Sequence, residues 1–337
     1  MNDKDLGHAY ELLDRLTAYQ KPAIIMAAHR LAVFEALARG AAGPEELASE
    51  LNVPQRSLGV LLRACVALGL LERKNGVYKN SELAAVTLVP KSPGYIGRLV
   101  DKEYVFYQAW ADLAGCVALD EPALAPIKER ARRDPETTRN FLEALDDIAA
   151  LYGGAFSGML DLQGNERVLD IGGGVGSYAV ALTRDYPELE VTVLDLPVVA
   201  PWARNFVENA GLSNRVDVQS GDFMTDGFPS GYDIVLFSNI FHDQPPTINR
   251  GLLANAYAAL SEGGSVVVHD FLLDDDRVSP VGSAVFAVMM LVENAGGNVY
   301  TGGDIESWLA TAGFREVTSL RFPEPSPMGL VQGRKLT

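Results

Sequence analysis

The pattern of apolar and polar residues divides the chain into a helical first half and a second half in which strands and helices alternate. Near the start, apolar side chains recur at helical spacing, as at Leu12, Leu13 and Leu16. From residue 166, apolar runs such as VLDI, VTVL, DIVLF and SVVV alternate with helical segments. Runs of this kind suit strands that are covered on both faces. The alternation therefore predicts an α/β fold with a doubly wound parallel sheet.

Residues 44–80 carry a different local pattern, two short helices followed by a hairpin. Pro54 opens the second helix, and LLERKNGVYKN predicts two strands around the Asn75-Gly76 turn. This order is typical of a winged helix, which either binds DNA or serves as a dimerisation or protein-interaction module. The second helix offers few cations, so we favour dimerisation.

Residues 95–160 predict further helices. One of them begins at Asp134-Pro135, a capping residue followed by proline at the first helical position. Tyr104 and Tyr107 lie about one helical turn apart. Aromatic residues at this spacing usually pack in a hydrophobic core, and they can also line a substrate pocket.

The bulk composition narrows the range of partners. The formal net charge of −16 repels nucleic acid and anionic membranes. The first residues hold no apolar signal core, and charges interrupt each apolar stretch before the roughly 20 residues that a membrane span needs. We therefore expect a cytoplasmic protein that binds neither nucleic acid nor membrane. Cys65 and Cys116 lie in apolar helical contexts without a C-x-x-C pair, which favours buried free thiols.

A glycine-rich turn, DIGGGVG, follows the first strand of the α/β region. Glycine allows positive φ angles and close approach of a ligand to the backbone, and the next helix directs its first amide donors at that ligand. The candidate cofactor-binding residues of this turn are Asp170, Gly172, Gly174 and Gly176.

Two cofactors use such a turn, a nicotinamide dinucleotide and S-adenosylmethionine (SAM). A dinucleotide needs its pyrophosphate on the helix N-terminus, whereas SAM has no phosphate and carries a cationic sulfonium. The acidic Asp170 just before the glycines favours a cation. The long helical region before the turn also differs from many dehydrogenases, which open with the dinucleotide fold. We therefore favour SAM.

Acidic residues at the ends of the next two strands extend this candidate cofactor site. Asp195, with Leu196 beside it, ends the second strand, where an acidic side chain can bind ribose hydroxyls. Gly221-Asp222-Phe223 ends the third strand. There an acidic group can meet an adenine amine and an aromatic ring can cover the base.

The fourth and fifth strands end in histidine-aspartate pairs. His242, near the end of the fourth strand, is a candidate general base because the usual imidazole pKa of roughly 6.5 leaves it able to accept a proton. His269-Asp270 ends the fifth strand, and only one of this pair should face the pocket because adjacent strand residues point opposite ways. No H-x-x-x-H or facial ligand pattern is visible, so we expect no metal.

Together these residues resemble the caffeate-type and polyketide-tailoring O-methyltransferases. The resemblance runs through VLDIGGGVGSYAVALTRDYPELEVTVLDLP, GDFMTDGFPSGYDIVLFSNIFHD, EGGSVVVHDFLL and DIESWLATAGF. It implies a Rossmann-like SAM-binding domain preceded by an α-helical winged-helix dimerisation domain. It implies domains at residues 1–95 for dimerisation, 96–160 for a helical linker that contributes to the substrate pocket, and 161–337 for methyl transfer.

The resemblance also implies roles for particular residues. His242 matches the catalytic histidine and Asp270 one of two carboxylates that flank it, while Ser238 lies where many relatives have a lysine or serine near the adenine. The second carboxylate belongs to a G-G-K/R-E-R-T segment, and Val299 replaces its glutamate here. The expected acceptor pocket adds Tyr104, Tyr107, Phe286, Met289, Met290 and Asn294.

We therefore expect a homodimeric, SAM-dependent methyltransferase that acts on a hydroxyl of a small aromatic metabolite and releases S-adenosylhomocysteine. Because one flanking carboxylate is missing, methylation of carbon, nitrogen or sulfur in a small acid or secondary metabolite is an alternative. A catalytically silent, SAM-binding dimeric scaffold is another, and a ligand-controlled transcription regulator is a third.

Overall fold

A computed structural model describes residues 3–160, 162, 166–324 and 326–336. The chain forms two compact units, Met1–Phe106 and Tyr107–Thr337, which are described one at a time. The first unit contains α1 (Asp3–Thr17), α2 (Gln20–Arg30), α3 (Val33–Ala38), α4 (Pro44–Glu50), α5 (Gln55–Ala67), β1 (Leu71–Lys74), β2 (Val77–Asn80) and α6 (Glu82–Thr87). Helix α7 (Gly97–Ala109) contains the boundary between the two units.

The first unit has the helix, helix, hairpin order predicted from residues 44–80, as α4, α5, β1 and β2. Asn75 and Gly76 both have positive φ angles, 52° and 83°, as the tight turn between the strands requires. The core of this unit gathers apolar residues from its helices and hairpin, including Phe34, Leu47, Leu62 and Tyr78.

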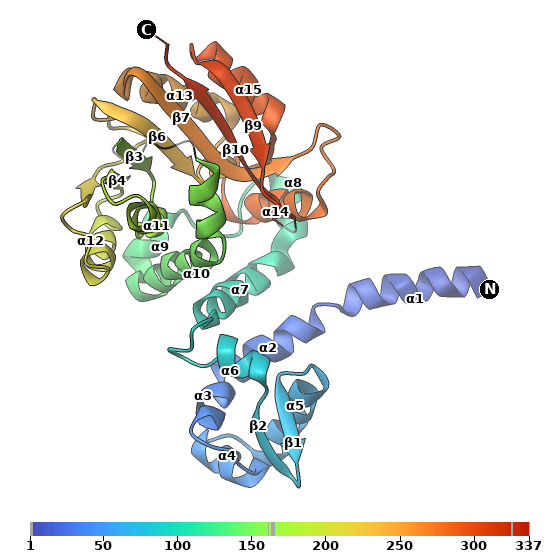
Figure 1. Ribbon diagram of the computed structural model, residues 1–337. Helices are drawn as coiled ribbons and strands as arrows, with labels where there is room; N and C mark the ends of the chain where they lie inside the picture. Colours follow the sequence, from blue (N-terminus) through green and yellow to red (C-terminus); the bar gives the residue numbers. More distant parts are fainter. Residues whose placement is uncertain (1–2, 161, 163–165, 325, 337) are drawn as a thin grey trace. The chain divides into compact units, whose positions relative to one another are not determined.

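The second unit is an α/β domain (Figure 1). Its helices are η1 (Trp110–Asp112), α8 (Leu113–Leu119), α9 (Ile127–Arg133), α10 (Pro135–Met159), α11 (Ser177–Asp185), α12 (Ala200–Asn209), η2 (Phe241–Asp243), α13 (Pro246–Ala259), α14 (Val281–Glu293) and α15 (Gly302–Thr311). Its strands are β3 (Arg167–Ile171), β4 (Glu190–Asp195), β5 (Val216–Ser220), β6 (Tyr232–Ser238), β7 (Leu260–Leu273), β8 (Tyr300–Thr301), β9 (Arg315–Arg321) and β10 (Met328–Arg334).

The strand order of the central sheet is β5-β4-β3-β6-β7-β10-β9, with β8 paired to β7. Strands β3 to β7 are parallel, and β10 is antiparallel to both β7 and β9. The predicted doubly wound parallel sheet is therefore present, but an antiparallel hairpin completes one side of it.

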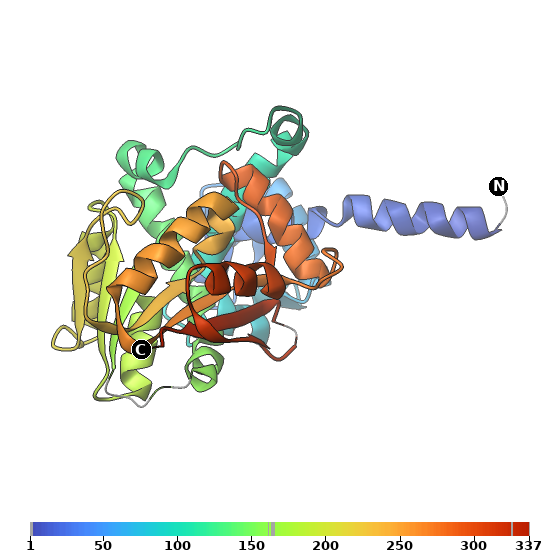
Figure 2. The same ribbon diagram turned by 90° about the horizontal axis from the view of Figure 1, so that it is seen from above.

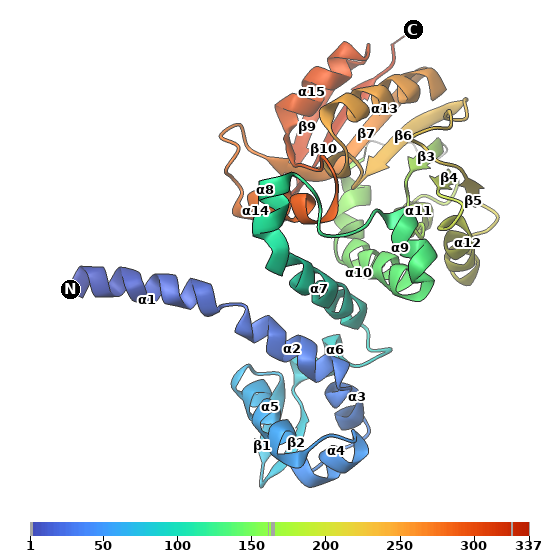
Figure 3. The same cartoon turned by 180° about the vertical axis from the view of Figure 1, so that it is seen from behind.

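Helices cover both faces of this sheet, as the apolar runs predict. On one face, α13 and α15 pack on side chains such as Val235, Phe237 and Val268. These two helices lie side by side in the orange and dark red part of Figure 2. On the other face, α10, α11 and α12 pack on residues such as Val193 and Leu236. Figure 3 shows α9 and α11 beside α10.

Two features of the sheet differ from the expectation. Strand β7 begins at Leu260, ahead of the predicted apolar run SVVV, because the chain passes directly from α13 into the strand, and Gly263 has a φ angle of 79° there. Strands β9 and β10 were not predicted. Strand β9 is largely exposed and lacks alternation of apolar and polar residues, so it gives no period-two signal. No helix in the described part of the chain is long and apolar enough to cross a membrane.

Gly329 lets β10 approach β7 closely, opposite Asp270. A Cβ atom at this position would lie 2.4 Å from Leu272 Cδ1 and 2.8 Å from the Leu320 carbonyl oxygen. We predict that Gly329→Ala lowers the free energy of unfolding by roughly 1–3 kcal/mol, as overpacking typically does. Urea denaturation followed by tryptophan fluorescence measures this change.

Gly303→Ala in α15 is the matched control. The nearest atom to its added Cβ, Thr301 Oγ1, would be 3.8 Å away, and the site is exposed. The control should leave stability unchanged or raise it, because alanine favours helix more than glycine does. Equal losses of stability in both variants would contradict the close approach at Gly329.

Candidate active site

The candidate site lies at the carboxyl ends of the parallel strands. The strand order reverses between β3 and β6, and crevices at such a reversal are the usual ligand sites of open α/β sheets. The glycine turn follows β3, Asp195 ends β4, residues 221–223 follow β5, and Asp270 lies near the end of β7. The topology thus collects the predicted residues at one edge.

The glycine turn has the backbone that the sequence predicts. Gly172, Gly174 and Gly176 have φ angles of 66°, 60° and 91°, which favour glycine. A Cβ atom on Gly172 would lie 2.5 Å from Ile240 Cδ1. Helix α11 begins at the next residue after Gly176, so its first amide groups face the turn.

Asp170 is a buried acid near the end of β3. Within the described ranges neither of its carboxylate oxygens has a hydrogen-bond partner, and its side chain is 1% exposed. Burial, reinforced by the charge of Asp195, raises the pKa of Asp170 to about 7. A buried carboxyl that lacks any cation fits a ligand with a positive charge, and the sulfonium and amino groups of SAM meet that requirement.

Asp195 holds the glycine turn in place. Its Oδ2 accepts a hydrogen bond from the Gly174 amide at 2.8 Å, and its Oδ1 accepts one from the Leu196 amide at 2.6 Å. Burial raises the pKa of Asp195 to about 6, although these two amide donors oppose the shift. A carboxylate retains further lone pairs after two such bonds, so ribose hydroxyls could still bind it.

Asp222 and Phe223 lie in the loop after β5. The Asp222 carboxylate forms an ion pair with Lys128 of α9 and accepts a hydrogen bond from the Met224 amide at 3.1 Å. Burial alone would raise the pKa of Asp222, but the bond to Lys128 and the amide outweigh it and lower the pKa. Phe223 lies near the turn, because its ring would be 3.1 Å from a Cβ atom on Gly172. Gly221 is buried against Leu194.

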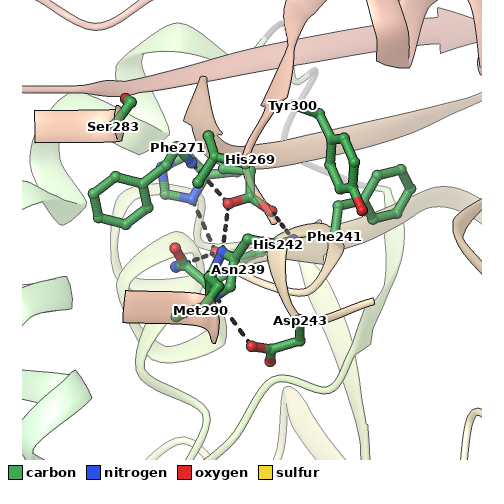
Figure 4. A network of polar contacts seen from close by, with 12 residues as sticks. Asn239, Phe241, His242, Asp243, His269, Phe271, Ser283, Met290 and Tyr300 are labelled. Carbon is green, nitrogen blue, oxygen red and sulfur yellow. Dashed lines mark hydrogen bonds and ion pairs between the residues drawn. The ribbon is translucent and has the colours of Figure 1, made fainter. Parts of the chain in front are cut away.

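Asp270 orients His242 through two contacts. The imidazole Nδ1 lies 2.5 Å from Asp270 Oδ1, and the His242 backbone amide donates to Asp270 Oδ2 at 3.1 Å (Figure 4). Because a carboxylate only accepts, Nδ1 carries the proton and Nε2 of the neutral ring is free to accept one. Burial lowers the pKa of His242, but Asp270 and Asp243 outweigh it and raise the pKa to about 9.

Asp243 lies on the other side of the His242 ring. Its Oδ1 is 3.5 Å from His242 Nε2 and accepts a hydrogen bond from Asn294 Nδ2 at 2.6 Å. Burial and the neighbouring carboxylates raise the pKa of Asp243, and His242 opposes this shift. The histidine therefore has a carboxylate near each ring nitrogen.

His269 faces away from His242, as the alternation along β7 predicts. Its Nδ1 is 2.9 Å from Ser238 Oγ, and aromatic rings surround it, including Phe156 at 4.7 Å between centroids. Burial lowers the pKa of His269 to about 4, so the ring stays neutral. Ser238, proposed as a cofactor contact, thus has a partner inside the domain.

Three of the expected acceptor-pocket residues lie on α14. Phe286 meets the His242 ring edge to face at 4.9 Å and stacks on Phe271 at 3.7 Å. Met290 is buried, and Met289 is partly buried. Asn294 follows the last residue of the helix and bonds Asp243, as described above.

The two expected tyrosines lie on α7. Tyr104 belongs to the first unit, where the Arg30 guanidinium lies 4.0 Å from its ring centroid, and Tyr107 opens the second unit with 39% of its surface exposed. Their role in an acceptor pocket stays a prediction, as do the roles of the other predicted site residues.

Sequence reasoning missed two cations of this region. Lys128 and Arg130 of α9 reach Asp222 and Glu293, respectively. Both partners are far away along the chain, so no local pattern marks these pairs. In the described part of the chain, no group of three or more His, Cys, Asp and Glu residues is arranged to hold a metal ion.

The unpartnered Asp170 gives a pH-dependent prediction. The folded carboxyl keeps its proton up to about pH 7, whereas the unfolded one loses it near its ordinary value of 3.8. Between these values the folded state binds more protons, so stability falls as the pH rises. We predict that Asp170→Asn gains stability relative to the wild type by roughly 2–4 kcal/mol between pH 4 and pH 8.

Urea denaturation at several pH values measures this difference, and calorimetry should show weaker binding of S-adenosylhomocysteine and SAM. Asp217→Asn, an exposed substitution near the other end of β5, is the control and should change neither property. A stability difference that stays constant with pH would contradict the assignment.

Comparison with known proteins agrees with this architecture. Residues 122–315 match the O-methyltransferase domain model, and residues 13–90 match the O-methyltransferase dimerisation domain model. The chain is 38% identical over 329 residues to 3-hydroxy-5-methyl-1-naphthoate 3-O-methyltransferase of Streptomyces sahachiroi, covering 96% of this chain and 94% of that protein. It is 32% identical to the N,N-dimethyltransferase OxyT of Streptomyces rimosus, over 80% of each chain.

The fold is also close to that of a solved relative. Human N-acetylserotonin methyltransferase in complex with SAM superposes with a TM-score of 0.88 at 26% identity, covering 98% of both chains. The matched domain models cover more than half of the chain, and the relatives match nearly end to end. This chain is a SAM-dependent methyltransferase and belongs to the O-methyltransferase family that carries an N-terminal dimerisation domain.

Proposed function

We propose that this enzyme transfers a methyl group to a hydroxyl of a small aromatic metabolite, with His242 as the general base. The observation that carries this proposal is the fixed imidazole. Asp270 holds Nδ1 and the backbone of His242, so Nε2 is the ring nitrogen that can take a proton from an acceptor. Phe286, edge-on to the same ring, provides apolar surface beside it.

Bound SAM supplies an electrophilic methyl group on a positively charged sulfur. The chain contributes alignment, which can be worth roughly 7–11 kcal/mol when two reactants are held in a reactive geometry. Asp170 is a buried acid whose oxygens have no hydrogen-bond partner in the described residues, which supports a role opposite a cation, and Asp195 fixes the glycine turn through Gly174. We assign Asp170 and Asp195 to cofactor binding and not to proton transfer, because no hydrogen bond joins either carboxylate to the His242 ring in the described residues.

The proton of the acceptor hydroxyl moves to His242 Nε2 as the oxygen attacks. Asp270 at Nδ1 and Asp243 near Nε2 stabilise the imidazolium that forms. The same carboxylates raise the pKa of His242, so the ring is a stronger base than an unpaired histidine once it is neutral. The enzyme therefore needs a pH high enough to deprotonate the ring before the acceptor binds.

The acceptor class follows from the relatives and from the aromatic residues. The relative from Streptomyces sahachiroi is named for methylation of a hydroxynaphthoate. Here Phe271 and Phe286 stack on each other, and Phe286 lies against His242, so a flat aromatic acceptor suits the apolar surface beside the base. Hydroxy-substituted aromatic acids are the first acceptors to test.

A second candidate, methylation of nitrogen or carbon, has one specific observation in its favour. Val299 stands where the resembling enzymes carry a glutamate, and its side chain is buried and apolar. The relative from Streptomyces rimosus is named as an N,N-dimethyltransferase. Nitrogen and carbon acceptors therefore belong in the same panel.

We predict that His242→Ala lowers the turnover of a hydroxyaryl acceptor by roughly 10²–10⁴-fold, the usual contribution of a general base. The affinity for S-adenosylhomocysteine should stay within about twofold, because among the described residues no hydrogen bond, ion pair or ring contact joins His242 to a residue assigned to the cofactor. Mass spectrometry of acceptor panels detects a gain of one methylene per transfer. Calorimetry gives the affinity.

Two results would contradict the proposal in different ways. Loss of cofactor affinity together with activity would make His242 a structural residue. Methyl transfer to amines or carbon acids alone, with no hydroxyl acceptor in the panel modified, would support the second candidate.

We also propose that the enzyme is a homodimer. The matched dimerisation domain supports this, and α1 exposes apolar side chains at one turn after another, with Leu12 58% and Leu16 63% exposed. An unpartnered apolar helix face of this kind is typical of an interface between subunits.

Size-exclusion chromatography with light scattering should give twice the 36.3 kDa chain mass. We predict that Leu12→Glu with Leu16→Glu shifts the enzyme to monomer, because two charges would enter the apolar interface. Lys4→Glu, an exposed polar substitution on α1, should leave the dimer intact. A monomeric wild-type chain would refute the assembly.

A further inference from the structure

The end of α14 is attached to two different parts of the domain through three successive residues. The Val292 carbonyl oxygen accepts hydrogen bonds from the amides of Ala123 and Leu124 at 2.9 and 3.1 Å. Glu293 Oε1 accepts one from Arg130 Nη2 at 2.8 Å, and Asn294 bonds Asp243. This helix end therefore joins α9 and the segment before it to the loop that carries His242.

Glu293 is a buried acid with a single cationic partner in the described residues. Its side chain is 10% exposed and that of Arg130 is 18% exposed. The Arg130 guanidinium also lies 4.8 Å from the Phe141 ring centroid, which restricts its position. A partly desolvated ion pair with one side packed on an aromatic ring holds its carboxylate in place better than an exposed pair does.

Glu293 lies on the side of Asp243, because the next residue, Asn294, donates a hydrogen bond to Asp243 Oδ1. The Glu293 carboxylate raises the pKa of both His242 and Asp243, and Arg130 opposes the effect on Asp243. The other charged groups that face His242 are Asp270 from β7 and Asp243 from η2. His269, on the same strand as Asp270, stays neutral at the pH of catalysis.

The family motif expects two carboxylates around the histidine, and one is missing. Val299 occupies the position of the second, and a buried apolar side chain cannot carry charge. Asp243, 3.5 Å from His242 Nε2, is one acid that remains beside the ring. Glu293 ends α14, next in the chain to the Asn294 that bonds Asp243, and is a second buried acid on that side.

We propose that Glu293, held by Arg130, is a positioning residue that adds its negative charge to those of Asp270 and Asp243 and stabilises His242 when it takes up the acceptor proton. This inference rests on the proposed role of His242 as the base. Glu293 acts through His242 and Asp243 and contacts no reacting atom. Arg130 sets the strength of this effect, because it neutralises part of the charge and fixes its place.

The test uses Glu293→Gln and Arg130→Gln in the full-length enzyme. The chain has only four histidines, so isotope labelling of histidine lets NMR follow the imidazole of His242 through a pH titration. His242→Ala identifies its signal. We expect the pKa of His242 to fall by about one unit in Glu293→Gln, which removes a negative charge.

In Arg130→Gln the pKa of His242 should rise, because Glu293 then lacks its cation. The two variants should therefore shift the pKa of His242 in opposite directions. If the Arg130–Glu293 pair only held the structure together, either substitution would break it, and both would shift the pKa in the same direction. Above the pH at which His242 is neutral, kcat of Glu293→Gln should fall about two- to tenfold because the base is weaker. The KM for the acceptor should change less than twofold.

Glu316→Gln is the matched control, because its carboxylate is exposed in an ion pair with Arg334 on β10. It should change neither the pKa of His242 nor kcat. Thermal unfolding shows whether each variant is folded. If Glu293→Gln does not fold, Glu293→Asp serves instead, and it should lower the pKa of His242 by less while keeping a charge near Arg130.

The proposal is overturned when a folded Glu293→Gln leaves the pKa of His242 unchanged, or when both variants shift it in the same direction. Failure of the proposed function would be recognised separately. In that case the rise of kcat/KM with pH in the wild type would not follow the NMR titration of His242, whatever Glu293 does.

Discussion

The reversal of strand order between β3 and β6 governs the arrangement of the whole site. Strands on either side of this point end at the same edge of the sheet, and each contributes a polar side chain there. The predicted cofactor residues come from β3, β4 and the loop after β5, with Ser238 at the end of β6, whereas His242 and Asp270 come from the region after β6 and from β7. One topological feature therefore places most of the predicted donor residues on one side of the reversal and the proposed base with its carboxylate on the other.

Two buried acids of the candidate site, Asp170 and Asp270, differ in their hydrogen-bond partners. Asp170 has no partner in the described residues, so it gains most from a ligand that brings a positive charge. Asp270 is equally buried, but it is satisfied by the ring and backbone of His242 and by the Phe271 amide. A buried carboxylate without a partner favours the binding of a cationic ligand. A carboxylate whose oxygens are already hydrogen-bonded, such as that of Asp270, holds its partner side chain in a fixed orientation.

Local patterns in the sequence predicted much of the fold. The Asn75-Gly76 turn, the Asp134 cap and the glycine turn each depend on residues close together in the chain, and all three have the predicted geometry. Strand β9 was missed because most of its side chains are exposed. The ion pair between Arg130 and Glu293 joins residues 163 positions apart, so packing alone determines it. The residues of the candidate site could be listed from the sequence, but their hydrogen bonds could not.

The antiparallel pairing of β10 with β7 has a consequence for the order in which the enzyme matures. Gly329 pairs with Asp270 across these strands, so the acid that holds His242 is secured by β10, which is synthesised after the other strands of the sheet. During synthesis, β3 to β6 leave the ribosome well before β10 is made. The core around β3 also contains residues of β7, α15 and β10, such as Val268, Leu309 and Val331, so a nascent chain completes neither part of the candidate site until β10 has emerged.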